Sequence, residues 1–225
     1  MNSSDLRPAD FYAISSGVKA VIYGPPGTGK TPIVKTCPNP ILLATEKGML
    51  SMKGSNVPTY EALTAKELDG FFAWLFSSTE VKKYDTVCID SSSHCAEIYL
   101  EDAKRNTKHG LQQYGEMSER TFAQFKKLNE MKEKHAYIIA KEDLYTVNNT
   151  QMKRPFYPGK ELPRETAHLF DCIFHLAKVN IPGVIGEQSA FRCNGSFDIL
   201  ARNRVGVLNE FEFPDFSMIV KKCGY

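Results

Sequence analysis

One stretch near the start of the chain, residues 24–31, sets the strongest limit on what this protein can fold into. It reads Gly-Pro-Pro-Gly-Thr-Gly-Lys-Thr and fills every required position of the phosphate-binding loop G-x-x-x-x-G-K-[ST]. The apolar residues 18–23 before it are typical of a short buried strand, and residues 31–36 after it read as the first turns of a helix. Because this order of strand, loop and helix is the context that the motif needs, we expect the chain to bind a nucleoside triphosphate rather than to form a plain glycine-rich turn.

The positions of this loop have separate roles. Its glycines let the backbone curl so that successive N–H groups point at the β-phosphate, and the start of the following helix adds a favourable dipole. Lys30 is expected to reach the β- and γ-phosphates, and the Thr31 hydroxyl to hold Mg²⁺. The residues expected to contact ATP in this loop are Gly24, Pro25, Pro26, Gly27, Thr28, Gly29, Lys30 and Thr31.

A carboxylate, Glu46, follows the next apolar run, residues 41–45, which is typical of a strand buried on both faces. At the carboxyl end of a parallel strand beside the phosphate loop, Glu46 would face the γ-phosphate and could orient or deprotonate an attacking water. The alternative is a solvated charge at the end of a strand, and the spacing alone leaves both interpretations open.

Two later apolar strands also end in polar residues. Residues 86–90 read Thr-Val-Cys-Ile-Asp, the pattern of the second nucleotide-binding motif, in which the aspartate holds Mg²⁺ through water. Residues 135–140 form another buried strand, followed by Lys141 and Glu142, either of which could sense the γ-phosphate. We therefore expect Thr31 and Asp90 to hold the metal ion and Lys141 to be a further contact to the nucleotide.

The remaining elements follow from periodicity and caps. Residues 60–76 have apolar side chains at helical spacing, with Thr64 as the expected cap, and residues 104–115 are polar and glycine-containing, as in a loop. Alternating patterns predict antiparallel strands in the C-terminal part. The further helices are expected at 94–104, 116–134 and 165–170, and the further strands at 171–177, 189–193, 197–202, 211–213 and 218–220.

Residues 144–163 show no periodicity, and a structureless segment of this length in a compact domain is usually functional or mobile. It interleaves positive charges with aromatic rings, the combination that binds phosphates and stacks bases in proteins that bind single strands. The residues expected to contact nucleic acid are Lys153, Arg154, Phe156, Tyr157 and Lys160. A subunit contact or a plain solvated loop explains the same residues.

Two arginines, Arg202 and Arg204, lie at an expected hairpin tip or strand end, residues 202–206. An arginine that reaches the γ-phosphate of a neighbouring subunit would make hydrolysis depend on assembly. A pair of solvated surface charges is the alternative.

Composition sets only broad limits. A chain of 225 residues that is 42% hydrophobic can bury one sizeable core, so we expect a single domain with a polar lead-in over residues 1–16. The net charge of +2 favours no class of partner, and the six cysteines form no C-x-x-C pair, as in reduced cytosolic proteins. No apolar run is long enough for a bilayer, so we expect a cytoplasmic protein with no membrane partner.

In their order and spacing, these motifs resemble one family, the phage-type RecA-like ATPases of the AAA type, which include single-strand annealing ATPases of phage recombination. The resemblance implies an α/β fold with a RecA-like core: a mostly parallel sheet flanked by helices, with antiparallel C-terminal edge strands. It also implies that Glu46 is the catalytic carboxylate and that Arg202 or Arg204 enters the site of a neighbouring subunit. The matching segments are residues 24–31, 44–52, 86–90, 113–115, 139–142, 158–163 and 201–206.

We therefore expect an ATPase that uses Mg²⁺, assembles into a ring or filament and acts on single-stranded DNA in phage recombination or replication, within the host cytoplasm if it is phage-encoded. A nucleotide-dependent assembly factor with a protein partner is the alternative from a different class. A small-molecule kinase is a third possibility, although the sequence shows no arginine-rich lid.

Overall fold

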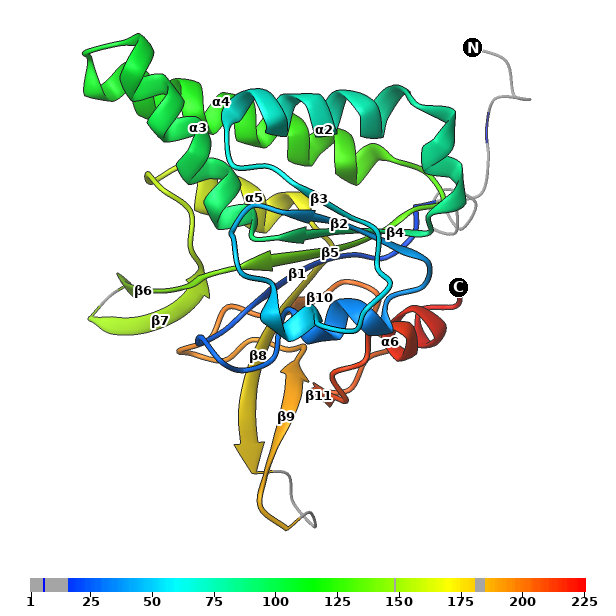
Figure 1. Cartoon of the computed structure of the whole chain (residues 1–225). Helices are drawn as coiled ribbons and strands as arrows, with labels where there is room; N and C mark the ends of the chain where they lie inside the picture. Colours follow the sequence, from blue (N-terminus) through cyan, green and yellow to red (C-terminus); the bar gives the residue numbers. More distant parts are fainter. Residues whose placement is uncertain (1–5, 7–15, 148, 181–184) are drawn as a thin grey trace.

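The computed structural model describes residues 6, 16–147, 149–180 and 185–225. Within these residues the fold is built on one large mixed sheet, with strands in the order β11-β9-β8-β1-β5-β4-β2-β3 and β10 paired beside β8 (Figure 1). Its parallel part consists of β1 (Lys19–Tyr23), β2 (Pro40–Ala44), β3 (Thr59–Glu61), β4 (Thr86–Asp90), β5 (His135–Ala140) and β8 (Cys172–Asn180).

The C-terminal edge of the sheet is antiparallel. β9 (Glu187–Arg192) and β10 (Arg202–Asn203) pair with β8, and β11 (Phe211–Glu212) pairs with β9, all in antiparallel register. The predicted architecture, a mostly parallel sheet flanked by helices with antiparallel C-terminal edge strands, is therefore confirmed.

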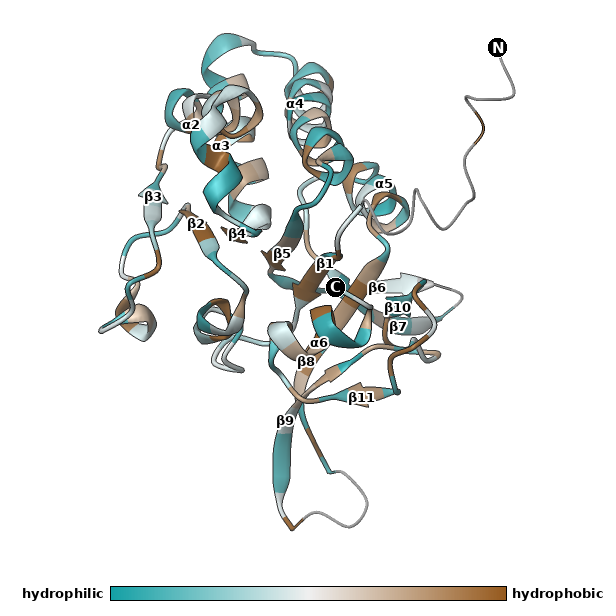
Figure 2. Ribbon diagram, turned by 90° about the vertical axis from the view of Figure 1, so that its right-hand side faces the viewer, coloured by the Kyte–Doolittle hydropathy of each residue, from teal (hydrophilic) through white to brown (hydrophobic). Residues whose placement is uncertain are grey.

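Helices cover both faces of the sheet, because the side chains of each buried strand alternate between two cores. On β1, for example, Val21 and Tyr23 join the core beneath one helical layer, whereas Ala20 and Ile22 join the core on the opposite face. The first layer contains α2 (Ala65–Ser77), α3 (Ser92–Asn106), α4 (Gly110–Glu130) and α5 (Leu162–Leu169); the opposite face carries the 3-10 helix Pro32–Thr36 and α6 (Phe216–Lys222). Figure 2 shows the hydrophobic residues of the central strands between these two helical layers.

Local signals set the start of α2 as predicted. The Thr64 hydroxyl accepts a hydrogen bond from the Glu67 backbone N–H, and the Glu67 carboxylate accepts one from the Thr64 N–H, which is a complete capping box. Two short 3-10 helices lie in the connections nearby: Leu50–Met52 between β2 and β3, and Thr79–Lys83 between α2 and β4.

The prediction of a loop over residues 104–115 is wrong, since α3 continues to Asn106 and α4 already begins at Gly110. A buried stripe along α4 fixes this helix against α3 and α5, and helix propagation then carries it toward its N-terminus despite two glycines. The Gln113 side chain also donates to the Thr107 carbonyl and stabilises the first turn.

The prediction of a structureless segment over residues 144–163 is also wrong. β6 (Glu142–Val147) and β7 (Thr150–Pro155) pair in antiparallel register as a separate two-stranded sheet. At the turn, Asn149 adopts a φ of 63°, a left-handed conformation that asparagine tolerates better than most residues. The sequence signal was therefore the asparagine turn between β-branched residues, which is typical of a hairpin.

Two tail strands were predicted wrongly as well. Residues 218–220 belong to α6, where Asp215 caps the helix and Phe216, Ile219 and Val220 form a buried face at helical spacing. Most of residues 197–202 are irregular, and only Arg202 and Asn203 form a strand. Among the described residues, no helix combines the length and the apolar character that a membrane crossing requires.

Candidate nucleotide site

The phosphate loop lies at the carboxyl edge of the parallel strands, immediately after β1 (Figure 1). β1 is central, because β5 and β8 pair with its two sides, and Tyr23 lies opposite Ala140 on β5 and His175 on β8. The register of the neighbouring pair places Ala44 of β2 opposite Asp90 of β4. The strand ends that precede Glu46, Asp90 and Lys141 therefore meet at the edge that carries the loop, as predicted.

Two glycines in the loop have distinct structural reasons. A Cβ on Gly24, whose φ is +155°, would lie 2.1 Å from the Leu176 carbonyl oxygen of β8, so only glycine allows this close approach. Gly29 has a φ of +93°, and an added Cβ would meet no atom within 4 Å, so the requirement there is conformational. The open space at Gly29 leaves the loop backbone accessible to a phosphate.

Lys30 folds back onto the loop. Its ammonium donates to the carbonyl oxygens of Gly24 and Pro25, at 2.7 and 2.8 Å. Burial lowers the pKa of Lys30, and the carboxylates of Asp90 and Glu142 oppose that shift. The buried Tyr137 hydroxyl donates to the Lys30 carbonyl at 3.0 Å and fixes the backbone beneath the side chain.

The structure brings Thr31 and Asp90 together, as the sequence predicted for a metal site. The Thr31 hydroxyl donates to Oδ2 of Asp90 at 2.5 Å. Burial raises the pKa of Asp90 and the nearby Glu46 raises it further, whereas the Thr31 bond and Lys30 lower it. A buried carboxylate in this setting is stabilised by a cation.

Mg²⁺ fits this pair, since it binds oxygen ligands and is commonly held by one or two protein groups together with substrate phosphates. In the described part of the chain, no group of three His, Cys, Asp or Glu side chains is placed to hold a metal ion by itself. Thr31 and Asp90 would therefore hold Mg²⁺ together with a bound nucleotide, where the ion would neutralise charge on the β- and γ-phosphates.

Glu46 follows the end of β2 by two residues, and its side chain is half exposed. The Ser91 hydroxyl donates to Oε1 of Glu46 at 3.5 Å, and the Lys141 ammonium lies 3.9 Å from the same oxygen. Lys141 makes a shorter ion pair, at 2.7 Å, with Glu97 of α3. Lys141 therefore lies between two carboxylates beside the site, those of Glu46 and Glu97. Its predicted contact with the nucleotide stays a prediction.

The helix expected after the phosphate loop is present, but it is short. It is a 3-10 helix of five residues, Pro32–Thr36, which ends before the Cys37-Pro38 step. Its dipole is correspondingly small, so the loop N–H groups and Lys30 would supply most of the attraction for phosphate. α6 supports this short helix, because the Phe216 N–H donates to the Thr36 hydroxyl at 2.9 Å.

One predicted base-stacking residue, Tyr157, is unavailable for stacking. Its side chain is buried, with 2% of the residue exposed, and packs against Phe125 with ring centroids 6.0 Å apart. Its hydroxyl lies 2.9 Å from that of Ser92. The prediction is wrong for Tyr157, because the chain returns to the core directly after the hairpin.

The other predicted nucleic-acid contacts lie on or just after the hairpin. Arg154 on β7 forms an ion pair with Asp143 at 3.1 Å and stacks over the Tyr145 ring at 4.0 Å. Lys153 and Phe156 are partly exposed, and Lys160 is exposed. Their binding to nucleic acid stays a prediction.

Arg202 and Arg204 lie beside the amino end of β8, where Arg202 pairs with Ile173. The Arg202 guanidinium donates to the carbonyls of Ala167 and Phe170, so it caps the end of α5. Arg204 forms a 3.2 Å ion pair with Asp171, and 47% of its side chain is exposed. Within one chain both lie at the end of β8 away from the phosphate loop, so either could reach a nucleotide only in a neighbouring copy.

Sequence analysis missed a residue that adjoins the site, His175. This side chain is buried, and its Nε2 lies 2.7 Å from Oε2 of Glu142, the first residue of β6. The only available signal was a histidine within the apolar run 172–176, and its position level with Tyr23 emerges only from the pairing of β1 with β8.

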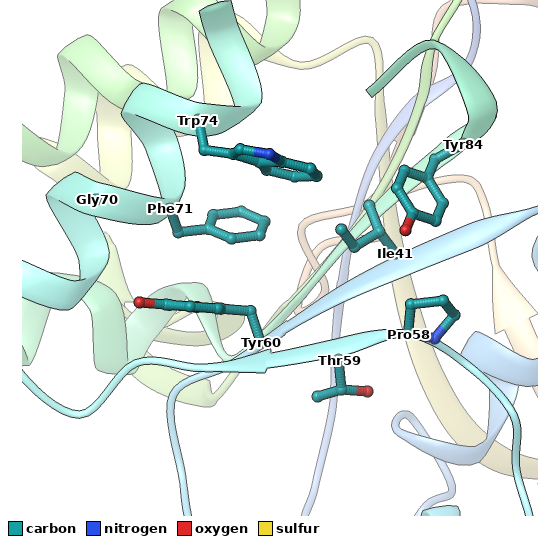
Figure 3. A pocket seen from close by; sticks show the side chains of 8 residues that line it. All are labelled: Ile41, Pro58, Thr59, Tyr60, Gly70, Phe71, Trp74 and Tyr84. Carbon is teal, nitrogen blue, oxygen red and sulfur yellow. The ribbon is translucent and has the colours of Figure 1, made fainter. Parts of the chain in front are cut away.

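Two hollows lie away from the phosphate loop. A pocket of about 510 Å³ at the β3 edge is lined mainly by the aromatic side chains of Tyr60, Phe71, Trp74 and Tyr84 (Figure 3). A larger groove of about 1220 Å³ lies between α4 and residues 158–165. The strands β5, β4 and β2 separate the aromatic pocket from β1, so this pocket is distinct from the nucleotide site.

Comparisons with known proteins identify a matching family and two similar solved structures. A family described as an AAA domain matches residues 16–202. No curated protein gives a significant sequence match. Among solved structures, the flagellar accessory protein FlaH from Methanocaldococcus jannaschii is similar over 92% of this chain and 91% of its own, with 14% identity and a TM-score of 0.48. A KaiC-like protein from Pyrococcus horikoshii OT3 is similar over 88% of this chain and 82% of its own, with 12% identity and a TM-score of 0.45.

Proposed function

The chain belongs to this family of AAA domains, and we propose that it is a RecA-like P-loop ATPase that binds and hydrolyses ATP with Mg²⁺ at residues 24–31. The observation that carries the proposal is the 2.5 Å contact between Thr31 and Asp90 beside Lys30. It joins the two nucleotide motifs, which lie 59 residues apart in the sequence, at one edge of the sheet.

The arrangement assigns each side chain a part in hydrolysis. Lys30 would exchange its two carbonyl partners for phosphate oxygens, and Thr31 and Asp90 would hold the metal ion. Glu46 would orient a water for in-line attack on the γ-phosphate, held in place by Ser91 and Lys141. Its half-exposed carboxylate is reachable by solvent, as this role requires.

The direct test compares ATP binding and hydrolysis in the wild type, Lys30→Ala and the matched control Lys35→Ala. Lys35 is an exposed lysine on the neighbouring 3-10 helix, where it donates to the Ser51 carbonyl. We expect Lys30→Ala to lose ATP binding or turnover and Lys35→Ala to keep both. Unchanged ATPase activity in Lys30→Ala would overturn the assignment.

We also propose that the ATPase acts on single-stranded DNA in phage recombination or replication. The DNA would be bound by the β6–β7 hairpin and the segment after it. The hairpin starts two residues after β5 ends, at the same edge of the sheet as the phosphate loop. Lys153 and Lys160 would contact backbone phosphates, and the partly exposed Phe156 would stack on a base.

This part of the proposal is tested by the ATPase rate with and without single-stranded DNA, measured over protein and salt concentration. We expect stimulation by DNA and an affinity that falls steeply with salt, with a shallower slope in Lys153→Ala/Lys160→Ala. Lys82→Ala, an exposed lysine on the 3-10 helix beside α2, is the control. A flat response to DNA would refute DNA binding and leave the nucleotide site standing.

We further propose that copies of the chain associate and that Arg204 completes the site of a neighbour. Arg204 is the better placed of the two arginines, because Arg202 is held by two carbonyl groups of its own chain. Mixing Lys30→Ala with Arg204→Ala should restore some activity. At one kind of mixed interface, the Arg204→Ala subunit supplies an intact phosphate loop and its Lys30→Ala neighbour supplies an intact Arg204. A mixture whose ATPase activity does not exceed the sum of the two separate variants would refute a role in trans.

A nucleotide-dependent assembly factor with a protein partner is the second candidate. It is favoured by Leu111, of which 92% is exposed, and by the partly exposed Tyr114, both on the first turns of α4 beside the larger groove. ATP binding combined with no response to DNA would favour this function.

A further inference from the structure

The base of the β6–β7 hairpin is tied to the elements that carry the nucleotide site. The Tyr23 hydroxyl, one residue before the phosphate loop, lies 3.1 Å from the Lys153 carbonyl oxygen on β7. Ser93, three residues after Asp90, donates to the Phe156 carbonyl at 2.6 Å. Both of these links are hydrogen bonds between neutral groups.

A third link at the hairpin base, from the start of β6, involves a charge. Glu142 opens β6, and its carboxylate lies 2.7 Å from Nε2 of His175, whose side chain is only 3% exposed. The His175 ring packs on Tyr23, with centroids 4.9 Å apart. The next residue, Leu176, carries the carbonyl against which Gly24 packs. His175 thus connects the hairpin to the strand that supports the phosphate loop.

Lys30 and Glu142 both lie beside the end of β1: the Lys30 ammonium donates to the Gly24 carbonyl, and the partner of Glu142, His175, packs on Tyr23, the residue before Gly24. The Glu142 charge also opposes the lowering of the pKa of Lys30 by burial. Lys30 is the residue that must pair with the phosphates of a bound nucleotide. A carboxylate free to approach Lys30 would compete with those phosphates for the same cation.

We propose that His175 is a positioning residue whose N–H holds the Glu142 carboxylate at the hairpin base and so keeps Lys30 free for the nucleotide. This inference rests on the proposed ATP site. Burial lowers the pKa of His175, although the hydrogen bond and the charge of Glu142 oppose that shift. An imidazole with a proton on Nε2 is a donor to Glu142 whether or not the ring is charged. The bond therefore needs no charge on the histidine.

Loss of this donor should have a specific consequence. In His175→Ala, the Glu142 carboxylate has lost its buried partner and can turn toward Lys30, so we expect the affinity for nucleotide to fall about tenfold, as for one charged hydrogen bond. Glu142→Gln removes the competing charge and should bind nucleotide at least as tightly as the wild type. The double variant His175→Ala/Glu142→Gln should return to within about twofold of the wild type, which is the coupling that a double-mutant cycle detects.

The experiment is a titration of each protein with a ribose-labelled fluorescent ATP and Mg²⁺, read as a dissociation constant. Thermal unfolding of each variant without nucleotide separates stability from affinity. His175→Gln keeps an N–H near the position of Nε2 and should bind as the wild type does. Together with Glu142→Gln it tests the proposal even if His175→Ala does not fold.

The outcomes are distinct. Recovery of affinity in the double variant supports the positioning role. A loss in His175→Ala that Glu142→Gln does not reverse would show a purely structural histidine and overturn the proposal, as would wild-type affinity in His175→Ala or weaker binding in Glu142→Gln. A wild-type protein that binds no nucleotide would instead overturn the proposed ATP site, and this inference with it.

Discussion

Gly24→Ala tests the close approach of the phosphate loop to β8. The new Cβ would lie 2.1 Å from the Leu176 carbonyl oxygen and 3.1 Å from its carbon, whereas real Cβ contacts are essentially never below 3.0 Å. Either β1 or β8 must therefore shift by roughly 1 Å within a packed core, and such overpacking costs about 1–3 kcal/mol. An alanine at a φ of +155° adds backbone strain of about 1–3 kcal/mol.

We therefore expect Gly24→Ala to lower the free energy of unfolding by about 3 kcal/mol, which for a domain of this size is a fall in Tm of about 6–12 °C. Urea denaturation and thermal unfolding measure these quantities. Gly70→Ala is a matched control, because Gly70 lies within α2 and an added Cβ would meet nothing within 4 Å. Gly70→Ala should stabilise the protein by about 1 kcal/mol through helix propensity. A Gly24→Ala protein within about 0.5 kcal/mol of the wild type would refute the reasoning.

Three further predictions concern the site and the core. Glu46→Gln should bind ATP normally and hydrolyse it at least about 100-fold more slowly; a normal kcat would remove Glu46 from the mechanism. Tyr157→Ala should lower the free energy of unfolding by about 3–5 kcal/mol, as for a buried ring, whereas a stable variant that has only lost DNA binding would contradict its burial. Burial lowers the pKa of Lys19 from 10.5 to about 8. At pH values between these two pKa values, the unfolded chain binds more protons than the folded chain. The free energy of unfolding from urea denaturation should therefore rise with pH, by up to about 3 kcal/mol. An equal rise in Lys19→Met would exclude Lys19 as its source.

Much of the site could be predicted from the sequence, because its chemistry is local. The loop 24–31 is a contiguous motif, Asp90 is the last residue of an apolar strand, and Glu46 follows another by two residues. Once the strands are taken as parallel, their carboxyl ends must meet at one edge, so the contact of Thr31 with Asp90 follows from topology.

The rest depends on pairings that no local pattern records. His175 reads as one polar residue in a strand, and its bond to Glu142 depends on the register of β8 beside β1. Tyr157 and Phe156 are adjacent aromatic residues with the same sequence signal, yet only Tyr157 points into the core. Residues 218–220 are a short apolar run that also suits a strand, and the cap at Asp215 together with packing against the 3-10 helix selects the helix instead.

The central position of β1 has a consequence for how the chain is made. Both partner strands of β1 follow it by more than a hundred residues in the sequence: Lys19 pairs with Ala136, and Ala20 pairs with Cys172. On the ribosome, the phosphate loop therefore emerges on a strand with neither neighbour present, and α6, which supports the 3-10 helix behind the loop, emerges later still. A nucleotide at the proposed ATP site would stabilise this domain only after β5, β8 and α6 are in place, so it could act as a late check on folding and could not guide the early steps.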